Sequence, residues 1–150
     1  MQQTASELAA LIHQYSDRLY GLKEEEVSFK PSPTKWSKKE ILGHLIDSAQ
    51  SNIRRFVVAQ YEEQPFIRYN QDAWVSITGY QQHEFKSIVD LWKLINLHIV
   101  RILSNLTPEM AQRTAKTSEM HTVEWLAIDY VKHLKHHIHQ VLDLEPVPYP

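Results

Sequence analysis

The 150-residue sequence contains no cysteine. This absence excludes disulfide bonds, thiolate metal ligands and a cysteine nucleophile, and it fits a reducing cytoplasm. Glycine is also scarce, with three residues at positions 21, 43 and 79 and no glycine-rich phosphate-binding motif. The low glycine content, together with many Leu, Ile, Gln, Glu and Lys residues, favours helical structure.

A basic excess and a long apolar run are missing as well. The formal net charge is -2 with neutral histidines, so the chain lacks the positive charge that binds nucleic-acid phosphates. We interpret the pair Arg54-Arg55 as a solvated helix face. No apolar segment approaches the roughly 20 residues needed to cross a bilayer, and residues 1–7 lack the pattern of an export signal. We expect no nucleic-acid partner, no membrane insertion and a cytoplasmic location.

Four segments carry apolar residues at the spacing of an amphipathic helix. The first begins at a predicted capping box, Thr4 to Glu7, and ends near Gly21, before an acidic run that we expect to be exposed. The second covers about residues 38–60. It follows another capping box, Ser37 to Glu40, with Trp36 placed for a hydrophobic staple.

The other two helices are expected at about residues 82–105 and from a Thr122 N-cap to about residue 144. Between the second and third helices lies a long connection, residues 61–80, with a short helix predicted near Gln71 to Ile77. Residues 107–121 are polar and predict a turn or a short hairpin. Three prolines predict an extended end of the chain: Pro146, Pro148 and Pro150.

These patterns predict an all-α fold, a four-helix bundle with a long crossover between its second and third helices. Such a crossover would allow the two helices that flank it to run parallel. The length is that of one domain, and we treat residues 1–150 as a single domain.

A histidine cluster is the densest chemical feature, with four of the nine histidines between His133 and His139. On a helix, His133 and His137 lie one turn apart on one face, with Cβ atoms about 5–6 Å apart. Two imidazoles at this spacing can bind one metal ion, as in helical zinc sites. The alternative is a pair of histidines at the edge of the core. His136 and His139 point away from that edge and are expected to be solvated.

A third ligand would separate these interpretations, and His44 is the candidate. It lies about two turns into the second helix, on a polar strip with Ser48 and Asn52 beside the apolar stripe. Helix packing could bring His44 level with His133 and His137. The pattern therefore permits a three-histidine site without requiring one.

Three segments, in order and spacing, resemble the DinB/YfiT-like metalloenzyme family. Residues 36–56 run from Trp36 and the capping serine through His44-Leu45-Ile46-Asp47-Ser48 and an asparagine to Arg55-Phe56, and resemble the second-helix signature of the family. Residues 133–140 look like its last-helix motif, and residues 69–74 are similar to its crossover segment. The resemblance covers about residues 5–143.

The resemblance implies a four-helix bundle in which His44, His133 and His137 bind one divalent metal ion. Nickel or zinc is the expected metal, with iron and manganese as alternatives, and a homodimer is the expected assembly. Characterised members of the family include thiol S-transferases, and others are regarded as metal-dependent hydrolases. We therefore expect a small-molecule substrate.

Three imidazoles leave coordination positions open, as catalytic rather than structural sites do. The hypothesis we favour is a metal-dependent hydrolase that activates water. One alternative is a metal-dependent small-thiol S-transferase, in which a substrate thiolate would bind instead. Another is a non-enzymatic bundle that holds a metal ion or a partner.

Five further residues are candidates for the surroundings of the site. Glu40 and Asp47 each lie within about a turn of His44, so either carboxylate could orient its imidazole, or else be an ordinary surface charge. The remaining candidates for the pocket wall, which would otherwise be packing residues, are Asn52, Trp74 and Tyr130.

Overall fold

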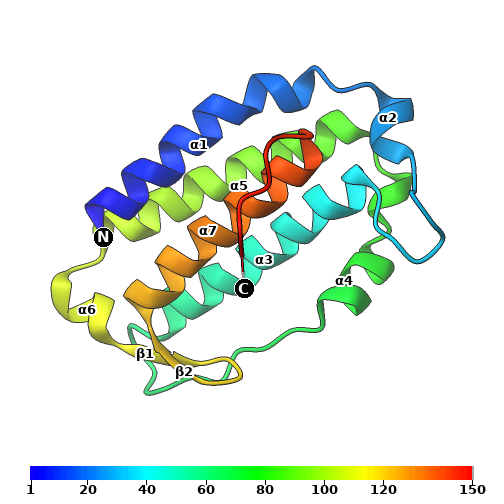
Figure 1. Ribbon diagram of the computed structural model, residues 1–150. Helices are drawn as coiled ribbons and strands as arrows, with labels where there is room; N and C mark the ends of the chain where they lie inside the picture. Colours follow the sequence, from blue (N-terminus) through cyan, green and yellow to red (C-terminus); the bar gives the residue numbers. More distant parts are fainter. Residues whose placement is uncertain (150) are drawn as a thin grey trace.

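A computed structural model describes residues 1–149 and shows four long helices packed as a bundle (Figure 1). They are α1 (Gln2–Tyr20), α3 (Lys38–Val58), α5 (Phe85–Asn105) and α7 (Val123–Val141). The connections hold α2 (Glu24–Ser28), α4 (Gln71–Thr78), a 3-10 helix η1 (Tyr80–Gln82), α6 (Pro108–Gln112) and an antiparallel pair of strands, β1 (Thr114–Lys116) and β2 (Met120–Thr122). The predicted all-α bundle is confirmed, and so is the hairpin before the last helix.

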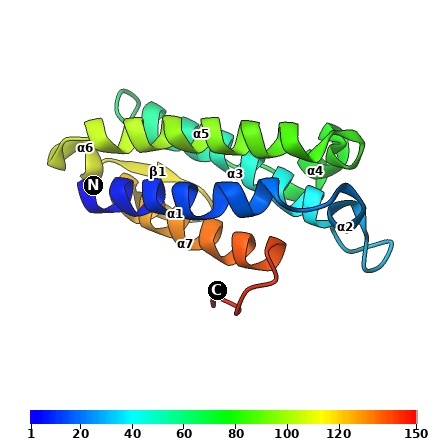
Figure 2. The same cartoon turned by 90° about the horizontal axis from the view of Figure 1, so that it is seen from above.

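The long helices pack around the core in the cyclic order α1, α5, α3, α7. Figure 1 and Figure 2 show that α3 and α5 run in one direction and that α1 and α7 run in the other. The connection 59–84 returns along the bundle to the end at which α3 begins, so α3 and α5 are parallel, as the crossover predicts. Because α3 and α7 are antiparallel neighbours, the early turns of α3 lie beside the late turns of α7.

Two of the predicted helix starts are capped as expected. Ser37 and Glu40 form the reciprocal capping box of α3, in which each side chain accepts from the other residue's backbone N–H. The Thr122 hydroxyl accepts from the backbone N–H of Trp125 at 3.1 Å and caps α7. These caps fix where the two histidine-bearing helices begin.

The predicted capping box at Thr4 is wrong. The backbone N–H of Ala5 donates to the carbonyl of Met1 at 3.0 Å, so α1 already begins at Gln2 and Thr4 lies inside its first turn. Once a turn has formed, each added residue gains a hydrogen bond, and the helix extends past an available cap.

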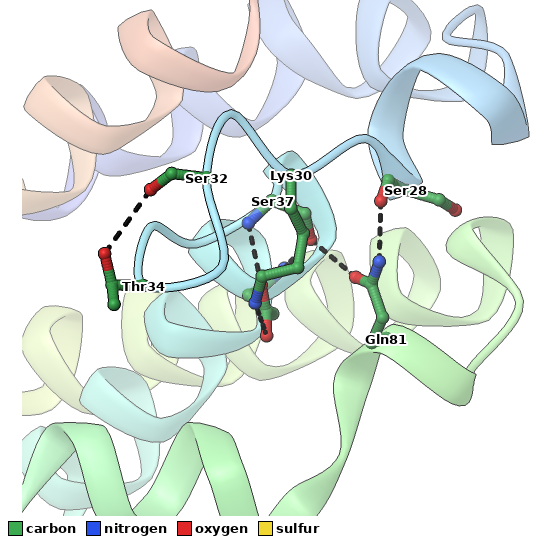
Figure 3. A network of polar contacts seen from close by, with 7 residues as sticks. Ser28, Lys30, Ser32, Thr34, Ser37 and Gln81 are labelled. Atoms are coloured by element: carbon green, nitrogen blue, oxygen red, sulfur yellow. Dashed lines mark hydrogen bonds and ion pairs between the residues drawn. The ribbon is translucent and has the colours of Figure 1, made fainter.

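A polar network ties the connection before α3 to η1 (Figure 3). The Lys30 ammonium donates to the Glu40 carboxylate at 2.7 Å, and the Ser37 hydroxyl donates to Gln81 Oε1 at 2.7 Å. The Gln81 amide nitrogen in turn donates to the carbonyl of Ser28 at 2.6 Å. The network joins α2, α3 and the end of the crossover.

The apolar stripes of the four helices meet in one buried cluster, as their periodicity predicts. Its largest fully buried side chains include Trp92, Tyr130 and Phe56. After α7 the chain turns back along that helix (Figure 1). Pro146 and Pro148 lie in this tail, which has no helix or strand, whereas Pro150 lies outside the described residues. Within residues 1–149, no helix is long and apolar enough to cross a membrane.

Candidate metal centre

Three histidines converge where α3 and α7 lie side by side. One ring nitrogen each of His44, His133 and His137 lies within 4.8 Å of the other two. The Nε2 atoms of His44 and His133 are 3.1 Å apart, and the ring centroids of His133 and His137 are 4.6 Å apart. Nitrogens bound to one zinc ion at about 2.0–2.1 Å would be about 3.3 Å apart in a tetrahedron. The 3.1 Å separation of His44 and His133 therefore fits a single ion, and the ring nitrogen of His137 lies within 4.8 Å of both.

Burial keeps these imidazoles neutral. Desolvation, and next the repulsion that a second protonated ring at His137 would exert, lowers the pKa of His44 to about 4. Desolvation is the main cause that lowers the pKa of His133 to about 2, and repulsion by protonated forms of the neighbouring histidines adds to it. Burial also lowers the pKa of His137. A neutral imidazole keeps a free lone pair for a metal ion, which a protonated ring lacks. All three rings are thus in the form that a metal binds.

Neighbouring side chains set the orientation of two of the rings. His137 Nδ1 lies 2.7 Å from Gln140 Oε1, an acceptor, so Nδ1 carries the proton and Nε2 keeps its lone pair. His133 Nδ1 lies 3.5 Å from the Ser48 hydroxyl, a long contact. His44 Nδ1 is buried without a hydrogen-bond partner among residues 1–149. Gln140 was missed from the sequence, although its place three residues after His137 is a usable signal.

The expectation that Glu40 or Asp47 orients His44 is not met. The Glu40 carboxylate closes the capping box and accepts from Lys30. Asp47 Oδ1 accepts from the Tyr80 hydroxyl at 2.5 Å. The Glu40 carboxylate is already used in the N-terminal cap of α3. Asp47 lies three residues after His44, and this step turns its side chain towards the neighbouring face of the helix.

A cavity of about 120 Å³ adjoins His133. Asn52 and Tyr130 line it, together with Ser48, Arg55, Tyr69, Asp129 and Tyr149. Trp74 does not line it: its ring packs against Tyr69 at 5.5 Å between centroids and borders another cavity beyond α3. A more open cleft of about 480 Å³ borders His137, with Trp36 and Gln140 among its walls. Both α7 histidines therefore have space beside them.

Arg55 is not the solvated residue that we expected from the sequence. Its guanidinium is half-buried, donates to the carbonyl of Ile67 and to Asn52 Oδ1 at 3.2 Å, and lines the cavity. Arg54, its partner in the sequence pair, is exposed. The two arginines face different surroundings because consecutive helical residues are about 100° apart.

His136 and His139, expected to be solvated, are half-buried and hold the C-terminal tail. Nδ1 of His136 lies 2.6 Å from the carbonyl oxygen of Val147, and Nδ1 of His139 lies 2.7 Å from that of Glu145. The tail places the Tyr149 ring 5.1 Å from the ring of His133. No helical periodicity describes this tail, so its path was outside the reach of the sequence patterns.

Four packed helices bring three neutral imidazoles together beside a cavity. The chain is therefore a helical-bundle protein with a candidate metal centre. Within that class, the chain belongs to the DinB superfamily, whose family model matches residues 7–141. The resemblance inferred from the sequence is confirmed.

Individual relatives agree with this assignment. The chain is 27% identical over 113 residues to YfiT of Bacillus subtilis (strain 168), and the alignment covers 73% of this chain but 64% of YfiT, less than two thirds of its length. The solved structure of YfiT, described as a probable metal-dependent hydrolase with an unusual four-helix bundle topology, matches with a TM-score of 0.76 and 24% identity. That match covers 95% of this chain and 82% of YfiT.

Two further solved structures share the fold. The mycothiol-dependent maleylpyruvate isomerase matches with a TM-score of 0.71 and 13% identity, over 97% of this chain and 60% of the isomerase. The DinB-like protein YjoA from Bacillus subtilis matches with a TM-score of 0.63 and 16% identity, over 98% of this chain and 96% of YjoA.

Proposed function

We propose that this chain is a metal-dependent hydrolase of a small molecule, and that His44, His133 and His137 hold one divalent transition-metal ion. The observation that carries the proposal is the convergence of three neutral imidazoles, from two helices, beside a cavity. Imidazole ligands suit zinc and nickel alike. The sequence similarity to YfiT supports hydrolysis as the type of reaction. The identity of the metal, the homodimer, the single domain and the cytoplasmic location stay predictions.

A divalent ion held by three histidines would act as a Lewis acid and lower the pKa of water towards 7. The chain supplies the positioning. Gln140 holds the proton of His137 on Nδ1, which leaves the lone pair on Nε2 free for a metal ion. Trp36 lies against His44 with 5.1 Å between ring centroids and shields that imidazole.

The cavity beside His133 would orient the polar end of a substrate. Its walls offer the Arg55 guanidinium, the Ser48 hydroxyl and the Asn52 amide. Burial and the neighbouring Asp129 raise the pKa of Tyr149, so its hydroxyl stays protonated and donates to that carboxylate at 3.0 Å. At about 120 Å³ the cavity admits a small functional group, since a water molecule takes about 30 Å³ of liquid.

A small-thiol S-transferase is the second candidate, favoured by the shared fold with a mycothiol-dependent enzyme. The cleft beside His137 would admit the thiol. One observable separates the two reactions: turnover that requires an added low-molecular-weight thiol supports the transferase. Turnover of esters, amides or phosphoesters without thiol supports the hydrolase. A loaded metal ion that promotes neither reaction would favour the non-enzymatic bundle.

Metal content is the primary test. Protein purified without a histidine tag should contain about one equivalent of a divalent metal by elemental analysis. The triple variant His44→Ala, His133→Ala, His137→Ala should contain none, because all three protein ligands of the proposed site are lost. The matched control replaces two exposed histidines, His13→Ala and His98→Ala, and should keep the metal. Equal metal in the wild type and the triple variant would refute the proposal.

A further inference from the structure

A second cavity, of about 560 Å³, lies between α3, α4, η1 and α5. Its walls are mainly apolar and aromatic and include Trp74, Ile77, Tyr80 and Leu91. The volume is within the range of about 300–1,000 Å³ that is typical of small-molecule sites, which combine apolar walls with a few polar groups. Ile77 and Leu91 are 84% and 50% exposed, so the rim of the cavity is open.

This cavity is separate from the histidine centre. None of the residues that line it lines the cavity at His133 or the cleft at His137. Helical rotation explains the separation, because His44 and Ser48 lie on one face of α3, whereas Ile46 and Gln50 point to a different side. A ligand in this cavity would not contact the three histidines.

Asp47 is the one carboxylate among the described residues that line the cavity, and it is 1% exposed. Its Oδ1 accepts from the Tyr80 hydroxyl at 2.5 Å, while Oδ2 has no hydrogen-bond partner within residues 1–149. Burial raises the pKa of Asp47 to about 6, against the opposing effect of the Tyr80 hydrogen bond. A buried carboxylate with a free oxygen is strongly stabilised by a cation that reaches it.

The remaining lining groups also favour a cation. Among the described lining residues there is no lysine or arginine, and His83 is the one residue that could carry positive charge. The nearby Lys39 ammonium donates to the carbonyl of His83 and pairs with Glu24, so it does not neutralise Asp47. Trp74 and Tyr80 add two aromatic rings to the lining, and aromatic rings attract organic cations.

Gly43 lets the ring of Tyr80 pack directly on the backbone of α3. A Cβ atom at this position would lie 2.1 Å from the Tyr80 ring, so the ring rests on the helix backbone at a point that only glycine leaves open. Asp47 lies one turn further along the same helix and accepts a hydrogen bond from the hydroxyl of that ring. The carboxylate is therefore held in place by a built contact between α3 and η1.

We propose that this cavity binds a small organic ammonium ion with an aromatic or aliphatic body, its charged nitrogen pairing with Asp47 and its apolar part lying against Trp74, Ile77 and Leu91. Binding there does not depend on the hydrolase function or on metal at the histidine centre.

The test uses 2-phenylethylammonium as the probe on the untagged full chain, with and without chelator. The neutral 2-phenylethanol and the anionic 3-phenylpropionate are its size-matched comparisons. The indole N–H signals of ¹⁵N-labelled protein report the location, since Trp74 lines the cavity and Trp36 lies beside His44. We expect a saturable shift of the Trp74 signal, unchanged by chelator, and binding of the ammonium at least about tenfold tighter than of either comparison.

Two kinds of variant test the pairing with Asp47. Asp47→Asn keeps the shape and removes the charge, and it should weaken ammonium binding about tenfold while leaving 2-phenylethanol unaffected. Ile77→Lys adds a positive charge at the rim and should also weaken ammonium binding. Leu94→Lys is its matched control, 64% exposed and outside the cavity, and should bind as the wild type does.

Because Ile77 and Leu94 are exposed, this pair decides the question even if the Asp47 variant fails to fold. The proposal is overturned if the three probes bind equally, if no saturable shift occurs, or if Trp36 shifts in place of Trp74. It is also overturned if Ile77→Lys binds the ammonium as tightly as Leu94→Lys does.

Discussion

The ring nitrogens that face away from the proposed ion decide how well the histidines are held. His137 has a hydrogen-bond acceptor at Nδ1, the Gln140 amide oxygen at 2.7 Å. His133 has the distant Ser48 hydroxyl, and His44 Nδ1 has none among the described residues. Partners of this kind fix the tautomer and the direction of a ligand ring, and losing one typically costs about 10- to 100-fold in metal affinity. His137 is the ring for which this effect can be measured most directly.

We predict that Gln140→Leu weakens metal binding about 10-fold or more, because His137 loses the acceptor that orients it. Competition with a chromophoric chelator measures the change. Gln140→Glu retains an acceptor at the same position and serves as the control, with affinity close to that of the wild type. Both variants alter an exposed side chain, so their unfolding curves should match the wild type. Equal loss of affinity in the two variants would contradict the orienting role.

Asp47 gives the apo protein a specific pH dependence. Its pKa in the folded state is about 6, above the ordinary value of 3.8, so the folded state binds the proton more tightly than the unfolded state does. Stability contributed by this group is therefore present at low pH and is lost as the pH rises through about 6. The resulting penalty at neutral pH is about 2–3 kcal/mol.

We expect Asp47→Asn, which cannot ionise, to gain stability relative to the wild type as the pH rises from about 4 to about 7, by about 2 kcal/mol. Urea unfolding of the metal-free proteins at several pH values measures the difference, and the other titrating groups cancel in the comparison. A difference that does not change with pH would show that Asp47 ionises in the folded protein as it does in solution.

Among the elements, α3 contributes residues to both the histidine centre and the second cavity, and Gly43 immediately precedes His44. Alanine is the better helix former by about 1 kcal/mol, so propensity alone predicts that Gly43→Ala stabilises the protein. The Cβ atom, however, would lie 2.1 Å from the ring of Tyr80, which is 3% exposed. The clash must displace the ring and break its hydrogen bond to Asp47.

We predict that Gly43→Ala lowers the free energy of unfolding by about 1–3 kcal/mol, the usual cost of overpacking. Gly21→Ala is the control, because a Cβ atom there meets nothing closer than 3.4 Å. Chemical unfolding of both variants tests the contrast. A Gly43→Ala protein as stable as the wild type would mean that η1 moves away from α3 at little cost.

The elements that could be predicted from the sequence are those governed by local rules. Apolar period located the four long helices, and the side chains of Ser37 and Thr122 marked where α3 and α7 begin. The predicted capping box at Thr4 was wrong because a local cap competes with extension of the helix towards the N-terminus. The tail could not be predicted, since its path depends on contacts of His136 and His139 with backbone carbonyls far from any pattern.

The same division holds for the site. The i, i+4 pair His133 and His137 follows from helix geometry, and His44 followed from the family resemblance. Which carboxylates and aromatic rings would surround them was not predictable, because a turn of α3 offers several directions. The positions of Asp47 and Trp74 in the sequence made them candidates for the histidine site. However, η1 and α4 pack on the other side of α3, and both residues line the second cavity there.

For the whole molecule, the proposed ion would join two elements that are distant in sequence. His44 comes from the first half of the chain and His133 and His137 from its last helix, so the set exists only when α3 and α7 are packed together. A ligand that binds the folded state alone stabilises it by mass action, by about 2.7 kcal/mol at a free concentration of 100 times its dissociation constant.

We therefore expect zinc or nickel to raise the unfolding temperature of the metal-free wild type, in a concentration-dependent way. The variant His44→Ala should lose most of this rise although it keeps the α7 pair, because the pair alone is local to one helix and can form without the bundle. The control variant His13→Ala, His98→Ala should respond as the wild type does, since both side chains are exposed. A rise of equal size in His44→Ala would show that the metal binds α7 alone, and the link between metal binding and the packing of α3 on α7 would be lost.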